Sequence, residues 1–146
     1  MRQLLAEARQ MGISVHIAHI DDDPRLRGYY LADRNMIVLR WGLTRAESRA
    51  VLAHELGHAF YGHIGESPLA ERQADIYAAR LLIDPERYAR LERINPDQHH
   101  LADELDVTVD VIYTFEAHCL QRLRGITYAR PKMGLGQWAY RSEVGA

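Results

Sequence analysis

The chain has 146 residues, of which 47% are hydrophobic and 26% are charged, and its formal net charge is −2. This length and composition are ordinary for one soluble globular domain with a substantial core. The charge excludes a strongly basic protein that coats nucleic acid or a membrane surface, and no apolar run is long enough to span a bilayer. Cys119 is the single cysteine, so no internal disulfide framework exists and we expect a reducing, cytoplasmic location.

The N-terminal part of the chain is typical of one helix followed by three short strands. Apolar residues at helical spacing predict a helix over residues 3–11, which Gly12 ends. Alternating apolar and polar residues predict a half-buried strand over residues 13–20. Residues 28–31 and 36–39 are strand-like and are separated by a short polar turn, which predicts a hairpin. A helix that covers this small sheet of about three strands would make it stable.

The next segment, residues 44–61, carries the main chemical motif of the chain. Thr44 and Glu47 form the sequence signature of a capping box, which predicts a helix start. His54, Glu55 and His58 form an H-E-x-x-H motif within that helix. Two histidines four residues apart lie about 40° apart around the axis and about 6 Å along it, so both imidazoles can reach one Zn²⁺. Glu55 then lies where a base must be to take a proton from water at the metal.

Helices also dominate the rest of the chain. Ser67 and Pro68 predict an N-cap and first helical position, and this second helix stops at Asp84 and Pro85. Further helices are expected over residues 85–93, 96–105 and 108–123, after which the pattern fades.

These elements predict an α+β fold with two regions. We expect a small sheet packed on the H-E-x-x-H helix and on a second, ligand-bearing helix, followed by a C-terminal helical pair. Residues 1–124 would form one zincin-like domain that includes this pair at residues 101–123. Residues 125–146 would form a C-terminal tail.

A catalytic zinc site needs a third protein ligand, and three residues compete for this role. Glu71 lies on the second helix, on the face predicted to oppose the zinc helix, one turn before Asp75. In this arrangement Asp75 would accept the spare N–H of a zinc-bound histidine as an outer partner. His63 would suit a longer zinc-binding pattern, but it stands one position from the required place. Asp75 as the ligand itself is the third alternative.

The two motifs together match a known family. The stretch HELGHAFYGH at residues 54–63, followed by ERQADIYAARLLI at residues 71–83, resembles the ImmA/IrrE-type zinc metallopeptidases. The resemblance covers roughly residues 1–123. Tyr77 stands where the family often has Phe, and Ile83-Asp84-Pro85 replaces a frequent Met-Pro ending. Neither departure touches a proposed ligand.

The resemblance implies a function as well as a site. It implies that His54, His58 and Glu71 bind Zn²⁺ and that Glu55 is the catalytic base. It also implies a cytoplasmic endopeptidase that cleaves a protein substrate, a repressor-type regulator of a phage or mobile element.

Two functions from other classes compete with the peptidase. One is a zinc-stabilised protein-binding module without turnover. The other is a DNA-binding regulator that uses a helix-turn-helix-like segment at residues 101–118. That segment carries Asp110 and Glu116 and no lysine or arginine, whereas DNA binding depends on cationic phosphate contacts. We therefore do not expect direct nucleic-acid binding.

Overall fold

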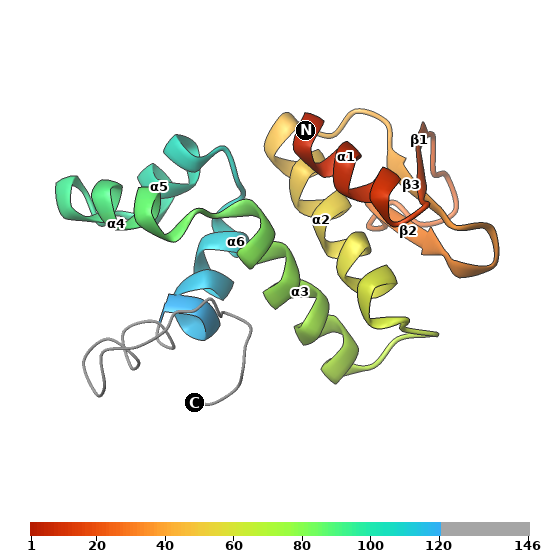
Figure 1. Cartoon of the computed structure of the whole chain (residues 1–146). Coiled ribbons are helices and arrows are strands. Elements are labelled where there is room, and N and C mark those ends of the chain that lie inside the picture. The colour runs from red at the N-terminus through yellow and green to blue at the C-terminus, as the bar shows by residue number, and fades with distance from the viewer. Residues whose placement is uncertain (121–146) are drawn as a thin grey trace.

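The computed structural model describes residues 1–120, and within them a small sheet and helices form an α+β fold. Two long helices, α2 and α3, lie side by side in the middle of the molecule (Figure 1). The sheet and α1 lie on one side of this pair, and the later helices lie on the other. The elements in chain order are α1 (Arg2–Gln10), β1 (Ser14–Ala18), β2 (Gly28–Leu31), η1 (Ala32–Arg34), β3 (Met36–Arg40), α2 (Arg45–Tyr61), α3 (Pro68–Leu82), α4 (Pro85–Ile94), α5 (Gln98–Leu105), α6 (Val109–Thr114) and η2 (Phe115–Leu120).

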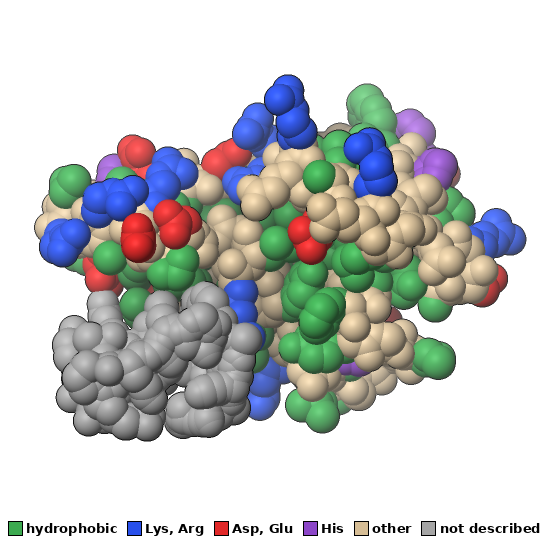
Figure 2. Space-filling view, viewed as in Figure 1, with side chains coloured by type: hydrophobic (Ala, Val, Ile, Leu, Met, Phe, Trp, Pro, Cys, Tyr) green, Lys and Arg blue, Asp and Glu red, His purple; other side chains and the backbone are tan. Residues whose placement is uncertain are grey.

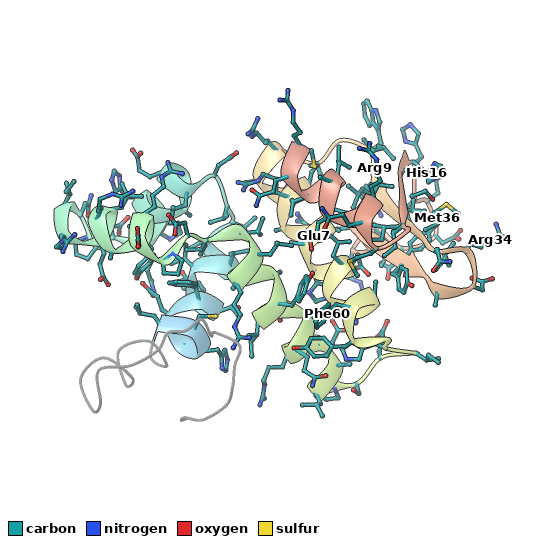
Figure 3. All side chains as sticks on the ribbon, in the orientation of Figure 1. Glu7, Arg9, His16, Arg34, Met36 and Phe60 are labelled. Carbon is teal, nitrogen blue, oxygen red and sulfur yellow. The ribbon has the colours of Figure 1, made fainter. Side chains whose placement is uncertain are left out.

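The sheet has three strands in the order β1-β3-β2, as the sequence predicts in number. β2 runs antiparallel to β3, which gives the expected hairpin, and β1 runs parallel to β3. The hairpin turn is the short 3-10 helix η1, followed by Asn35 at a φ of 48°. Asparagine tolerates this left-handed backbone better than most residues. Figure 3 shows Arg34 and Met36 at this turn, at the end of the hairpin farthest from the later helices.

The core is continuous from the central strand and α1, through the paired helices, to the C-terminal helices. β3 is the central strand of the sheet and buries Ile37, Val38 and Leu39 in succession. On α2 the residues Leu52 and Leu56 are fully buried, one helical turn apart. Burying such side chains stabilises the fold by roughly 1.5–3 kcal/mol each, so this face fixes the rotation of α2 about its axis.

Both ends of α2 are defined by capping residues that can be recognised in the sequence. The Thr44 hydroxyl accepts a hydrogen bond from the Glu47 backbone N–H at 3.2 Å, and the Glu47 carboxylate accepts one from the Thr44 N–H at 2.9 Å. These bonds, with Arg27 nearby, hold the pKa of Glu47 below its usual range. Gly62 ends the helix at a φ of 67°, a backbone that glycine adopts without steric cost.

The C-terminal helices pack against α3 and are tied to the start of α2. The turn between α5 and α6 contains Asp106, at a φ of 56°, and its carboxylate accepts a hydrogen bond from Arg45. Arg49 donates to the Asp106 carbonyl from the next turn of α2. The turn of the helix-turn-helix-like segment is therefore clamped onto the protein's own helix.

Two of the predicted helices differ from the structure in detail. The helix expected over 96–105 begins at Gln98, because Asp97 caps it by accepting from the His100 N–H at 2.9 Å. The helix expected over 108–123 is α-helical only from Val109 to Thr114 and continues to Leu120 as a π-helix. The remainder of that prediction and the tail at 125–146 lie outside the described residues. Within residues 1–120, no helix combines the length and apolar character needed to cross a membrane.

Removing the Thr44 hydroxyl should destabilise the protein. We expect Thr44→Ala to lower the free energy of unfolding by about 1 kcal/mol, since an N–H of α2 loses its partner. Thr108→Ala is the matched control, because Thr108 also precedes a helix but makes no side-chain cap bond. Chemical denaturation measures both variants, and equal losses would contradict this role for Thr44.

Candidate metal centre

Three side chains from two helices converge on one point. His54 and His58 project from α2, and their Nε2 atoms lie 3.1 Å apart. Glu71 projects from the start of α3, with Oε2 at 3.2 Å from the His54 Nε2 and Oε1 at 3.2 Å from the His58 Nε2. The three residues form a group of ligand atoms that could hold a metal ion.

The separations of these atoms fit a tetrahedral metal. Zn²⁺ binds nitrogen and oxygen ligands at about 2.0–2.1 Å, so two ligand atoms of a regular tetrahedron lie about 3.3–3.4 Å apart. The observed separations of 3.1 and 3.2 Å are close to this value. The side chains of His54, His58 and Glu71 are 21%, 12% and 43% exposed, so the group is held in place yet open to solvent at Glu71.

Asp75 lies behind His54 and not in the cluster of donors. Its Oδ1 is 2.8 Å from the His54 Nδ1, the ring nitrogen that faces away from His58. Burial alone would lower the pKa of His54, but the bond to Asp75 and the charges of Glu55, Asp75 and Glu71 raise it. With a proton on Nδ1 for Asp75, the Nε2 lone pair points at a Glu71 oxygen, and a cation between these two acceptors would satisfy both.

His63 does not join the donor cluster. Its Nδ1 lies 2.9 Å from the Nδ1 of His58, on the far side of that ring from the His58 Nε2. The left-handed Gly62 turns the chain back, so that the His63 N–H bonds the His58 carbonyl at 3.0 Å and the His63 ring reaches the outer side of His58. Among the described residues, the convergent donors are His54, His58 and Glu71.

Glu55 occupies a shielded position next to the first histidine. Burial raises the pKa of its carboxyl to about 7, and the charges of Glu71 and Glu66 add to this effect. His54 and a hydrogen bond from the Tyr30 backbone N–H act in the opposite direction. Glu55 and His54 both line the cavity described next.

A cavity of about 810 Å³ adjoins the cluster at His54. His54, Glu55 and Asp75 line it, whereas the other two members of the cluster, His58 and Glu71, do not. One wall is the segment at residues 25–28 that enters β2, and the opposite wall belongs to α6 with Tyr113. This volume is in the range of sites that bury small molecules or a few residues of a peptide.

Gly57 allows α3 to come close enough to supply Glu71. A Cβ atom built on Gly57 would lie 2.9 Å from the Cα and 3.1 Å from the carbonyl oxygen of Ala74. Both are backbone atoms, so no side-chain rotation can relieve the contact. Ala70, Ala74 and Ala78 recur every four residues on the buried side of α3, which keeps this face free of bulky side chains.

One residue of the site escaped the sequence analysis. Gln73 had no expected role, yet its Oε1 lies 2.8 Å from the Nε2 of His63. The helical spacing of residues 71 and 75 drew attention to the two carboxylates. Gln73 contacts His63 only because the turn before α3 brings His63 close to that helix. Of the tyrosines in residues 1–120, Tyr113 alone lines the cavity, and its position there depends on how α6 packs.

Comparison with known proteins agrees with this geometry. The IrrE N-terminal-like domain family, Peptidase_M78, matches residues 8–114, a span that contains the whole cluster. The chain thus belongs to this family of metallopeptidases. Its membership explains the order of the two motifs and implies protein substrates. No curated protein matches the chain significantly.

Filling the space at Gly57 should disturb the packing of the two helices. We expect Gly57→Ala to destabilise the protein by about 1–3 kcal/mol through overpacking, although alanine favours a helix over glycine by about 1 kcal/mol. Thermal and chemical unfolding measure the net effect. A gain in stability would show that the contact with Ala74 is not tight.

Proposed function

We propose that the protein is a zinc-dependent endopeptidase of the cytoplasm. His54, His58 and Glu71 hold Zn²⁺, Glu55 acts as general base, and Asp75 orients His54. The observation that carries this proposal is the convergence of two imidazole nitrogens and a carboxylate at 3.1–3.2 Å, beside a shielded carboxyl that borders a cavity. Membership of a metallopeptidase family supports the same chemistry.

The roles of the side chains follow from where their atoms lie. Zn²⁺, when bound, would supply Lewis acidity that activates water and polarises the substrate carbonyl. Glu55 takes the proton of the attacking water and returns it to the amine nitrogen that leaves. Asp75 holds the Nδ1 proton of His54 at 2.8 Å, which keeps the Nε2 lone pair directed at the metal position.

The cavity suits an extended peptide. Leu26, Arg27 and Gly28 line it where the chain enters β2, an edge strand of the sheet. An extended substrate can add to such an edge through backbone hydrogen bonds, with its side chains directed alternately to either side. Tyr113, on the opposite wall, is the tyrosine placed to donate toward a carbonyl oxygen within the cavity.

We propose a repressor-type regulator of a phage or mobile element as the physiological substrate. The resemblance to ImmA/IrrE-type peptidases supports this choice. The clamped α5–α6 turn supports a packing role over DNA binding for the helix-turn-helix-like segment. Glu116 is likewise engaged inside the protein, where it accepts from the Tyr88 hydroxyl at 2.5 Å.

Measuring bound zinc distinguishes the proposed ligand, Glu71, from the proposed outer partner, Asp75. We expect purified Glu71→Ala to lose bound zinc, because two imidazoles remain as the only donors. Asp75→Ala should keep the site and bind zinc about 10–100-fold more weakly, as outer partners of metal ligands usually do. Chelator competition and elemental analysis measure both. Full zinc binding by Glu71→Ala would remove this residue from the ligand set.

Cleavage separates an enzyme from a zinc-stabilised binding module. We expect Glu55→Gln to bind zinc as the wild type does and to lose cleavage of a quenched peptide library. It should also fail to cleave a co-expressed repressor whose gene neighbours that of this protein. Glu86→Gln is the control, since this exposed glutamate lies on α4, outside the cluster and the cavity lining, and should leave cleavage intact. If Glu55→Gln cleaves as fast as the wild type, the carboxyl is not the base.

A further inference from the structure

The outer ring nitrogen of His58 has a different partner from that of His54. Asp75 contacts the His54 Nδ1, whereas a second imidazole, that of His63, contacts the His58 Nδ1 at 2.9 Å. The other nitrogen of His63, Nε2, lies 2.8 Å from the Oε1 of Gln73. His58, His63 and Gln73 therefore form a continuous chain of hydrogen bonds that starts behind the metal position.

Metal binding fixes the direction of every bond in this chain. His58 can offer a lone pair from Nε2 only when its proton is on Nδ1. That proton must be donated to the His63 Nδ1, which is then an acceptor. The proton of neutral His63 consequently lies on Nε2, where the Gln73 carbonyl oxygen accepts it. The reverse direction would place a proton on the His58 Nε2 and block coordination.

We propose that His63 and Gln73 are positioning residues that fix the tautomer and ring orientation of His58 for zinc binding. This inference rests on the proposed metal site. His63 would thus serve His58 as Asp75 serves His54. The two histidine ligands differ because the partner of His54 is a carboxylate and the partner of His58 is a neutral imidazole. Outer partners of this kind usually change metal affinity about 10–100-fold.

The position of His63 is built into the turn between α2 and α3. Gly62 reverses the chain at a φ of 67°, and the His63 N–H then bonds the His58 carbonyl at 3.0 Å. The ring of Tyr61 stacks on that of His63, with centroids 5.4 Å apart and planes at 12°. The rings of His58 and His63 meet at 70°, an edge-on contact that suits a bond between ring nitrogens. These contacts restrict His63 independently of any metal.

Gln73 connects this relay to the helix that carries the third ligand. Glu71, Gln73 and Asp75 are alternate residues at the start of α3, and each contacts a histidine of the site. A shift of α3 would thus disturb the third ligand, the partner of His54 and the residue that holds His63 together.

Figure 3 shows Phe60 between α2 and α3, and the centroid of its ring lies 5.1 Å from that of Tyr77 on α3. Figure 2 shows hydrophobic side chains over this end of the two helices, where Phe60 and Ile64 are exposed.

The first experiment measures zinc affinity of full-length variants by chelator competition. His63→Leu removes the acceptor, and we expect it to weaken zinc binding about 10-fold or more. His63→Asn places its Oδ1 where the His63 Nδ1 lies, so it should recover most of that loss. His16→Leu is the control for loss of a histidine, because His16 lies on β1, outside the cluster, where its ring contacts the Ser14 hydroxyl (Figure 3). A purely structural role would not be rescued by asparagine.

The second experiment needs no substitution at His63. Long-range ¹H–¹⁵N spectra of the zinc-loaded wild type report the tautomer of each histidine, and we expect a proton on the Nε2 of His63. In Gln73→Leu the preference for this tautomer should weaken. A proton on the His63 Nδ1, or equal zinc affinity of His63→Leu and wild type, would overturn the relay while leaving the peptidase intact. A wild type that binds no zinc would instead overturn the proposed function on which the relay rests.

Discussion

The fit of α2 against α3 at Gly57 is the constraint on which the site depends. Only a residue without a side chain can lie there, because the backbone of Ala74 occupies the space that a Cβ would need. At this separation Glu71 reaches both histidine rings, and Asp75 reaches the back of His54. The candidate metal centre is thus positioned by the packing of two helices in the core and not by loops. Such support favours ligand positions that are fixed before a metal arrives.

Each element around the helix pair has a distinct task. The sheet buries one side of α2 and presents its edge strand to the cavity, while α6 forms the opposite wall. A backbone contact from Tyr30, on that edge strand, lowers the pKa of the Glu55 carboxyl against the effect of burial. A substrate lying along residues 26–28 would therefore contact the same strand that borders the cavity beside the proposed base.

The sequence predicted the parts of this structure that depend on short-range rules. The capping box at Thr44 and Glu47 is present, and the three predicted strands form the expected sheet. The four-residue spacing of His54 and His58 brings their Nε2 atoms together, as helical geometry requires. The order of the two motifs also indicated the family to which the chain belongs.

The remaining features depend on how the chain turns between elements. Residue spacing alone left Glu71, His63 and Asp75 as competing ligands, because it does not give the rotation of α3 against α2. His63 reached His58 through one left-handed glycine, Gly62, whose effect on direction a periodic pattern does not contain. The contact of Gln73 and the cavity wall at Tyr113 arise from tertiary packing alone.

X-ray absorption and a crystal structure of the zinc-loaded protein test the central claim most directly. The account predicts four ligands at about 2.0–2.1 Å, namely His54, His58, one Glu71 oxygen and a solvent molecule, with α2 and α3 unmoved. Coordination by His63, or a metal found away from Glu71 with the two helices separated, would contradict it.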